Sequence, residues 1–533
     1  YVRSVCKLVQ ADVVLSEDCL SQSELINPLL DRLISILTLS HTHLDVHTQN
    51  ALLHPWTDVF MLLASLLRRN HAACGPHVYG TLGRRWQRFS DTIRACVDQC
   101  GSDPSLYAVS AQFLCVLLSE EAKTRGTSEE KSASLTAALN SESGEKLCEL
   151  LLERYDKTQF QDPLKKVTAK VLMPLLACSS SAQSYACKAG LLDNCVEQMK
   201  QIYSQLHLES VRPGKTAHKK KEENSMKELR MVLEILRNCL YQHKECKEVA
   251  TDLKLSSVVS SLWPWLLLND GSMTAALELL CVYTANCTTA CSAVCGSSFH
   301  AALPRNPVTN SLMHAVMKLA SQVPLDNNNN IHALSFSLLA NLAISRDCRG
   351  LLQKSNFLQH FLSLPIPRLS SKNSKSSTAA AVLSQWLQLL LNISFEEDGQ
   401  QMIMKMRGAL EMFTDLAQGK HGDNKYKALL ILHNICFCSA NKPRVLACDK
   451  AVELLVSCLE SSLLNVRALG ASALWALLHN YQKAKAILKC PSIRLKVDGA
   501  YTLAKKGAEP KIEDNTNIYL LKCLEHLSHL LNT

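Results

Sequence analysis

The stretch Leu429-Leu-Ile-Leu-His-Asn434-Ile435 has close relatives elsewhere in the same chain. Phe336-Ser-Leu-Leu-Ala-Asn341-Leu342 and Leu387-Gln-Leu-Leu-Leu-Asn392-Ile393 follow the same pattern, a Leu-rich segment that reaches Asn and continues with an apolar residue. On an α-helix, the positions five, three and two before the Asn and one after it form a single apolar stripe, and the Asn lies at its edge. The stretch therefore predicts a helix that buries the same side in several copies.

The pattern recurs along most of the chain. Its anchor position falls at intervals of 42 to 60 residues, on Cys178, Asn238, Asn286, Asn341, Asn392, Asn434 and Asn480. Five copies share the stripe, and the position five before their anchors holds Leu233, Phe336, Leu387, Leu429 and Trp475. The Asn286 copy fits poorly, and the Cys178 copy lacks the Asn. Stacked helical repeats have periods near this range, so we expect a solenoid with loop insertions in most repeats.

A second amphipathic helix follows most anchors. It reads Gly408-Ala-Leu-Glu-Met-Phe-Thr-Asp-Leu416 in one copy and begins with Gly190-Leu-Leu in another. Glycine at this place suits a tight turn between helices that needs positive φ. An Asn-ending helix followed by Gly-Ala-Leu and a Leu-rich helix resembles the armadillo-repeat family. The fold that this implies is all-α, a right-handed α-solenoid of armadillo/HEAT-like helical repeats.

The repeats are expected to differ along the chain. Residues 1–160 are helical by pattern but lack the shared register, so we predict irregular HEAT-like repeats there. Residues 161–533 are predicted to form armadillo-like repeats, with loop insertions near 209–224, 296–308 and 365–377. The first of these segments is charged and almost devoid of apolar residues, and it contains His218-Lys-Lys-Lys221.

Composition excludes several classes of protein. The net charge of +9 is modest for 533 residues, and no basic and aromatic residues interleave as in single-strand-binding proteins, so we expect no nucleic-acid partner. No apolar run reaches membrane-spanning length; the stretch around Leu262 to Leu268 is short and contains Pro264. The 23 cysteines lie within Leu-rich patterns, so we interpret them as buried free thiols in a reducing compartment. Since the chain begins with Tyr1, we expect it to be part of a longer protein.

Three motifs could carry chemistry, and each has a plainer interpretation. Gly214-Lys-Thr216 resembles the end of a phosphate-binding loop but lacks the earlier Gly and the preceding strand. His43 and His47 have the spacing of zinc-protease ligands, but Leu44 stands where the general-base Glu is required. Cys287, Cys291 and Cys295 recur at zinc-like spacing, with Cys281 before and His300 after, yet a packing face of small residues explains them equally simply.

No motif of a nucleophile elbow, a dinucleotide site or a kinase occurs in the sequence. We therefore predict a protein that is not an enzyme, with no catalytic residue, metal, cofactor or small-molecule substrate. Lys219-Lys-Lys221 could be a nuclear-import signal, although a solvated loop is the commoner origin of such a run.

The Asn series is the candidate partner-binding row, composed of Asn341, Asn392, Asn434 and Asn480. One interpretation is a ladder of amides that binds the backbone of an extended partner peptide, since an amide offers both a donor and an acceptor. The other is that each Asn bonds to backbone near the helix end and sets the geometry between repeats. We favour the second, because amides that are not free in solvent must first be satisfied locally.

The C-terminal region carries a more specific resemblance. Arg467 to Leu488, Cys490-Pro-Ser-Ile-Arg-Leu-Lys496 and the Leu-rich segment from Tyr519 to Leu531 resemble the end of a family of large armadillo-repeat proteins of centrioles and ciliary basal bodies. The resemblance implies a scaffold that supports centriole assembly and elongation, cilium formation and left–right axis specification. It also implies a location in the cytoplasm and cytoskeleton, at the centrosome and basal body.

The partners implied are other proteins, in particular centriolar and ciliary assembly factors. Armadillo proteins that bind nuclear-import signals carry Trp four residues before the Asn. Here those positions hold Glu234, Ser337, Gln388, Leu430 and Ala476, which argues against that mechanism. The alternative function is an armadillo-type adaptor of another pathway, such as transport or ubiquitin ligation. An enzyme built from the loops is a third hypothesis.

Overall fold

The computed structural model describes a chain of helices. The described residues are 23–39, 46–69, 71–124, 133–159, 162–206, 216–296, 311–322, 330–362, 377–419, 422–506 and 515–532. None of them forms a β-strand. The chain divides into two compact units, Tyr1–Tyr283 and Thr284–Thr533. The expected all-α solenoid of armadillo/HEAT-like repeats is confirmed, whereas the expected change of repeat type near residue 160 stays a prediction.

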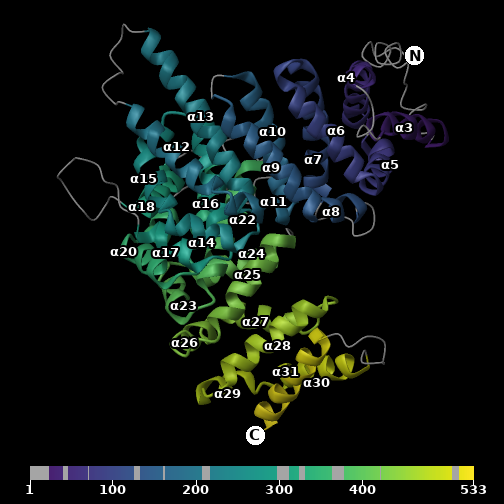
Figure 1. Ribbon diagram of the computed structural model, residues 1–533. Coiled ribbons are helices and arrows are strands. Elements are labelled where there is room, and N and C mark those ends of the chain that lie inside the picture. Colours follow the sequence, from purple (N-terminus) through teal and green to yellow (C-terminus); the bar gives the residue numbers. More distant parts are fainter. Residues whose placement is uncertain are drawn as a thin grey trace. The chain divides into compact units, whose positions relative to one another are not determined.

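The first unit is organised around one series of long helices. They are α4 (Val46–Arg69), α7 (Pro104–Thr124), α10 (Pro163–Cys178) and α13 (Thr216–Leu240), and each packs against the next. Helix α3 (Ser23–Leu37) precedes them, and between them in the chain come α5 (His71–Arg84), α6 (Trp86–Asp98), the short 3-10 helix η1 (Gln99–Gly101), α8 (Ala133–Leu139), α9 (Glu142–Lys157), α11 (Ser180–Lys188) and α12 (Leu191–Gln205). The helices after α13 are α14 (Lys244–Asp252), α15 (Leu255–Leu266) and α16 (Asp270–Thr284). Figure 1 shows the unit in purple to teal.

The second unit repeats a three-helix pattern. The first helices are α17 (Thr288–Gly296), α20 (Arg346–Lys354), α23 (Glu397–Met404), α26 (Lys442–Leu446) and α29 (Gln482–Leu488). The second helices are α18 (Leu312–Gln322), α21 (Phe357–Leu362), α24 (Ala409–Gln418), α27 (Asp449–Cys458) and α30 (Pro491–Lys506). The third helices are α19 (Asn330–Leu342), α22 (Ser377–Ile393), α25 (Gly422–Ile435), α28 (Leu464–Leu478) and α31 (Asn515–Asn532), and each packs against the next.

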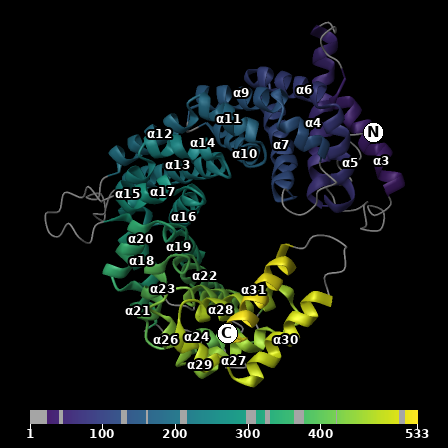
Figure 2. The same ribbon diagram turned by 90° about the horizontal axis from the view of Figure 1, so that it is seen from below.

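The predicted apolar stripe is buried on α13 of the first unit and on the third helices of the second unit. Its members three residues before the anchors are fully buried: Ile235, Leu338, Leu389, Ile431 and Leu477. Burial of one such side chain contributes about 1.5–3 kcal/mol, and every repeat adds several. In Figure 2, α19, α22 and α28 lie along one side of the second unit, and α18, α21 and α27 along the opposite side.

The third residue of the first helices is almost always small, a pattern that the sequence analysis did not identify. In six of seven helices, which are α11 and α14 of the first unit and the five first helices of the second, the third residue is small and buried: Ala182, Cys246, Ala290, Cys348, Gly399 and Ala484. A Cβ on Gly399 would stand only 1.8 Å from the carbonyl oxygen of Ile393, at the end of the preceding third helix. The helices meet closely here, so there is no room for a longer side chain. Helix α26 departs from the rule with Arg444.

Both glycines predicted to need positive φ have it. Gly190 has φ of 81° and Gly408 has φ of 70°, and each precedes a second helix. An L-residue is disfavoured in this left-handed region, which explains the glycine.

The predicted loop at 209–224 is wrong for its second half. Residues from Thr216 onward are helical and form the first turns of α13. Lys and Glu are good helix formers, and the charged stretch extends a helix that is anchored by its apolar end. Residues 207–215 lie outside the described residues, as do nearly all of the insertions predicted at 296–308 and 365–377.

No described helix combines the length and the apolar character that a membrane span requires.

The contact between α27 and α28 gives a test of the packing. A Cβ on Gly470 would lie 2.6 Å from Cys458 Cβ and 2.9 Å from the Leu455 carbonyl oxygen. We expect Gly470→Ala to destabilise this repeat by about 1–3 kcal/mol, because backbone or core atoms must shift. Hydrogen exchange of α27 and α28, together with a thermal melt, measures the loss.

Gly499→Ala is the matched control. Gly499 lies within α30, and a Cβ at this position would meet no atom within 4 Å. Alanine there should be neutral or stabilising by up to about 1 kcal/mol, through helix propensity. Equal effects of the two substitutions would contradict the close approach of α27 and α28.

Candidate functional site

Three residues of the Asn row connect consecutive repeats. Asn341 Nδ2 donates to Thr284 Oγ1 at 3.2 Å, Asn392 Nδ2 donates to the Ala340 carbonyl oxygen at 2.7 Å, and Asn434 Nδ2 donates to Ser394 Oγ at 2.9 Å. Each acceptor lies at or just beyond the end of the preceding third helix. The half-buried amides therefore bond one repeat to the next.

The amide oxygens of two of these residues are also occupied. Asn392 Oδ1 accepts from Gln388 Nε2 at 3.0 Å, and Asn434 Oδ1 lies 2.9 Å from His433 Nδ1. A peptide ladder would have to displace these bonds. The geometry thus favours the structural interpretation, and the ladder stays a prediction for a binding measurement.

Asn480 does not join the row. Helix α28 ends at Leu478, and Asn480 follows it with φ of 52°, exposed, its Nδ2 3.2 Å from its neighbour His479. Asn286 stands in the same relation to the end of α16, with φ of 53°. Asn tolerates the left-handed region better than most residues, so here it serves the turn. Trp475 is likewise only partly buried, and it stacks on His526 with ring centroids 5.0 Å apart.

A chain of hydrogen bonds continues from Asn434 across the last repeats. His433 Nε2 lies 3.0 Å from Ser472 Oγ, which lies 2.7 Å from the Tyr519 hydroxyl, so α25, α28 and α31 are linked. Because Asn434 Oδ1 can only accept, we place the proton of neutral His433 on Nδ1, and Nε2 then accepts from Ser472. Burial lowers the pKa of His433, and the bond to Asn434 opposes that shift in part.

Arg349 was not identified from the sequence, although it is the most connected charged residue of this region. Its side chain is buried, and its guanidinium donates to the carbonyl oxygens of Ala343 at 3.2 Å and Ile344 at 2.9 Å. Its Nε also donates to Asp398 Oδ2 at 3.0 Å, in the next repeat. A buried guanidinium needs such partners to offset its desolvation. No sequence signal marks it, because its acceptors come from two different repeats.

The cysteine triplet has two different roles. Cys291 Sγ donates to the carbonyl oxygens of Thr284 and Asn341, each at 3.5 Å, which fits a packing role. Cys295 forms a disulfide with Cys348, so the expectation of free thiols is wrong for this pair. Helices α17 and α20 pack side by side and bring the two Cα atoms to 6.0 Å, which a local sequence pattern cannot show.

The described residues contain no group of three or more His, Cys, Asp or Glu side chains that could hold a metal ion. His43 and His300 lie outside the described residues, as do Gly214 and Lys215.

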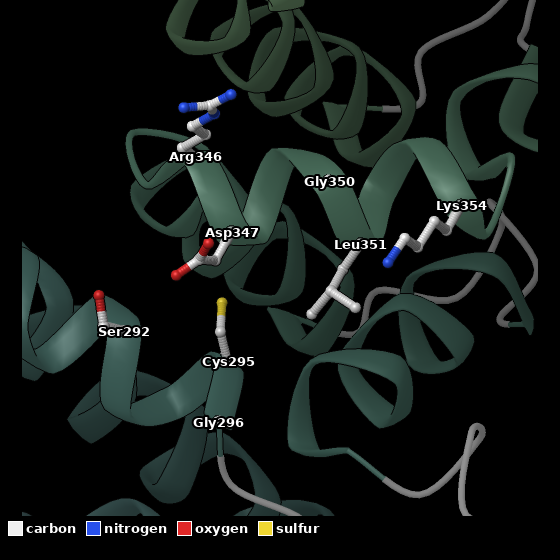
Figure 3. A pocket seen from close by; sticks show the side chains of 8 residues that line it. All are labelled: Ser292, Cys295, Gly296, Arg346, Asp347, Gly350, Leu351 and Lys354. Atoms are coloured by element: carbon white, nitrogen blue, oxygen red, sulfur yellow. The ribbon is translucent and has the colours of Figure 1, made fainter.

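A hollow of about 470 Å³ lies between α17 and α20, open to solvent (Figure 3). Its lining is Ser292, Cys295, Gly296, Arg346, Asp347, Gly350, Leu351 and Lys354. Figure 3 shows Asp347 on the side of α20 that faces Cys295, while Arg346 points away. With the Cys295 sulfur in a disulfide, and with neither a histidine nor a second carboxylate among the lining residues, the hollow lacks an activated nucleophile or an acid–base pair.

The chain is similar to proteins that are already known. The chain is 45% identical to human rotatin over 548 aligned residues and 44% identical to mouse rotatin over 546, covering 100% of the chain in both. It spans 24% of the length of these relatives. An engineered protein of known structure matches 95% of the chain and 99% of its own length with a TM-score of 0.56 at 15% identity, a likeness of fold alone. No protein-family model matches.

The structural interpretation of the Asn row predicts a loss of stability on substitution. We expect Asn392→Leu and Asn434→Leu each to cost about 1 kcal/mol, rising to about 3 kcal/mol if a buried partner is left unsatisfied. Asn480→Gly is the control, since this exposed residue lies in a turn that glycine also adopts. Thermal melts and local hydrogen exchange decide between the two interpretations. Unchanged stability together with lost partner binding would establish the ladder instead.

The lowered pKa of His433 predicts that the stability of the folded chain depends on pH. Its pKa is lowered in the folded chain, so the unfolded chain takes up the proton first as the pH falls. Stability should therefore be full above the ordinary histidine pKa of about 6.5 and should fall as the pH drops below it. His243 and His332 shift in the same direction, so the test compares wild type with His433→Gln. Denaturant unfolding at neutral and at acidic pH should show a smaller loss in the variant.

Proposed function

This chain is a relative of rotatin along its whole length, and on that premise we propose that it acts in centriole assembly and elongation and in cilium formation by binding partner proteins. The observation that carries the proposal is the 45% identity over the whole chain. The chain corresponds to 24% of rotatin, so the activity of the whole protein enters as part of the proposal.

The fold supports the scaffolding part of this proposal. A helical repeat scaffold presents a long surface whose repeats are alike in backbone and different in exposed side chains. Such a surface suits the binding of other proteins, and both the relation to rotatin and the repeat fold support the proposal that the chain is not an enzyme. The resemblance seen in the sequence supplies the centriolar part, including the role in left–right axis specification and the location at the centrosome and basal body.

An adaptor of another pathway, in transport or ubiquitin ligation, would use the same fold. The two functions differ in where the protein acts rather than in its architecture. A tagged full-length protein in dividing and ciliated cells therefore separates them. We expect signal at centrosomes and basal bodies that persists after extraction of soluble protein. A diffuse or nuclear-envelope pattern would overturn the centriolar function, and a tag-only protein is the control.

A further inference from the structure

Three large apolar side chains are exposed at one register of the second unit. They are Ile344, Phe395 and Phe437, with exposed fractions of 49%, 66% and 50%. Each lies three residues after an Asn that bonds to the preceding repeat, namely Asn341, Asn392 and Asn434. We call these three side chains the edge row. Single exposed apolar residues are ordinary, but recurrence at one position of three consecutive repeats is not expected from chance exposure.

The turns that carry the edge row are fixed by hydrogen bonds. Buried Arg349 donates to the Ile344 carbonyl oxygen and to Asp398, which follows Phe395 by three residues. Gln400 Nε2 donates to the Ser394 carbonyl oxygen at 3.0 Å, directly before Phe395. Because the backbone of these turns is already ordered, less conformational entropy is lost when a partner covers the exposed side chains.

A side-chain contact also links the turns that carry Phe395 and Phe437. Glu397 Oε1 lies 3.6 Å from Cys438 Sγ, next to Phe437, so the two phenylalanine-bearing turns lie side by side. Adjacent packed helices are about 8–10 Å apart, so the row offers three anchors at about that spacing.

Charged side chains of both signs flank the row, and adjacent carboxylates follow its middle member. Exposed carboxylates at the starts of α20 and α23 are those of Asp347, Glu396, Glu397 and Asp398, and exposed cations at the starts of α20 and α26 are Arg346 and Arg444. Asp398 is paired with buried Arg349, and Arg444 donates to the Met404 carbonyl oxygen at 2.5 Å. Glu396 and Glu397, directly after Phe395, therefore give the centre of the row a negative charge, although the chain as a whole carries +9. This charge complements a basic partner.

The backbone N–H and C=O groups of a bound partner segment must also be hydrogen-bonded. The amides of Asn341, Asn392 and Asn434 already donate between repeats, so they are only partly available to an extended peptide. An α-helix satisfies its backbone internally, and residues seven apart along it are about 10.5 Å apart, close to the spacing of the row.

We propose that the edge row is a docking surface for a basic amphipathic helix of a partner protein, with apolar residues at seven-residue spacing and Lys or Arg at the flanks. The apolar side chains of that helix cover Ile344, Phe395 and Phe437, and its cations face Glu396 and Glu397. The proposal deepens the scaffolding function proposed above and rests on it.

Two synthetic peptides that differ only in charge test the docking surface, with the whole chain as the binding protein. Each is an amphipathic helix of about 20 residues with one Leu stripe, long enough to be helical. One carries Lys on the flanks of the stripe and the other carries Glu. By fluorescence anisotropy, the Lys peptide should bind at least about tenfold more tightly than the Glu peptide. The triple variant Ile344→Ser, Phe395→Ser, Phe437→Ser should weaken it at least about tenfold. Glu396→Lys with Glu397→Lys should abolish the preference for Lys.

Leu463→Ser with Leu495→Ser is the matched control, because these leucines are 64% and 76% exposed in the same unit but lie outside the row. It should leave binding of the Lys peptide unchanged, and a thermal melt of every variant checks that the second unit stays folded. The proposal is overturned if the triple variant binds as well as wild type, if the control weakens binding equally, or if the Glu peptide binds as tightly as the Lys peptide.

The location of the full-length protein in cells tests the centriolar function separately from the peptide measurements. If the peptides fail while the wild-type full-length protein reaches centrosomes, the edge row is overturned and the proposed function stands. If the peptides bind as expected but the full-length protein is diffuse, the edge row stands and the centriolar function is lost.

Discussion

Everything in the second unit depends on how closely the end of one third helix meets the first helix of the next repeat. The carbonyl at the end of α22 leaves no room for a side chain on Gly399, and the equivalent positions of α17, α20 and α29 hold Ala290, Cys348 and Ala484. This approach lets consecutive third helices bury their Leu stripes against one another. It also removes water from the polar groups at the helix ends, which must then be satisfied by protein.

Asn341, Asn392 and Asn434, the Arg349 side chain and the hydrogen bonds from Asn434 to Tyr519 satisfy those polar groups. Each joins groups from different repeats, so the polar bonds and the apolar stripe specify the same neighbour. An apolar stripe alone would tolerate small slips along the helix axis. A bond from Asn392 to a particular carbonyl oxygen, or from Arg349 to two carbonyls and a carboxylate, does not. The repeats are therefore held in register at their ends and stabilised along their length.

These separate roles of the apolar stripe and the polar helix-end residues affect where a partner can bind. Interior positions are used for stacking, and the amides nearest the helix ends are used for register. Under the proposal above, recognition uses the set of side chains just beyond the helix ends, where hydrogen bonds fix the backbone. The edge row belongs to that set, and Glu396 and Glu397 beside Phe395 are the carboxylates that we propose select a basic partner.

The sequence by itself determined the helical fold, the buried stripe, the two left-handed glycines and the family, because each depends on local periodicity or on likeness along the chain. It misplaced Asn480, which lies two residues beyond the end of α28, and it predicted Trp475 to be more buried than it is. It extended a loop into α13, where a charged stretch is helical. Only the tertiary structure decided that Cys295 meets Cys348, that Arg349 bridges two repeats, and that Ile344, Phe395 and Phe437 stand together. Those facts arise from contacts between segments about 40 to 50 residues apart, and the distance between such segments is set by packing and not by local sequence.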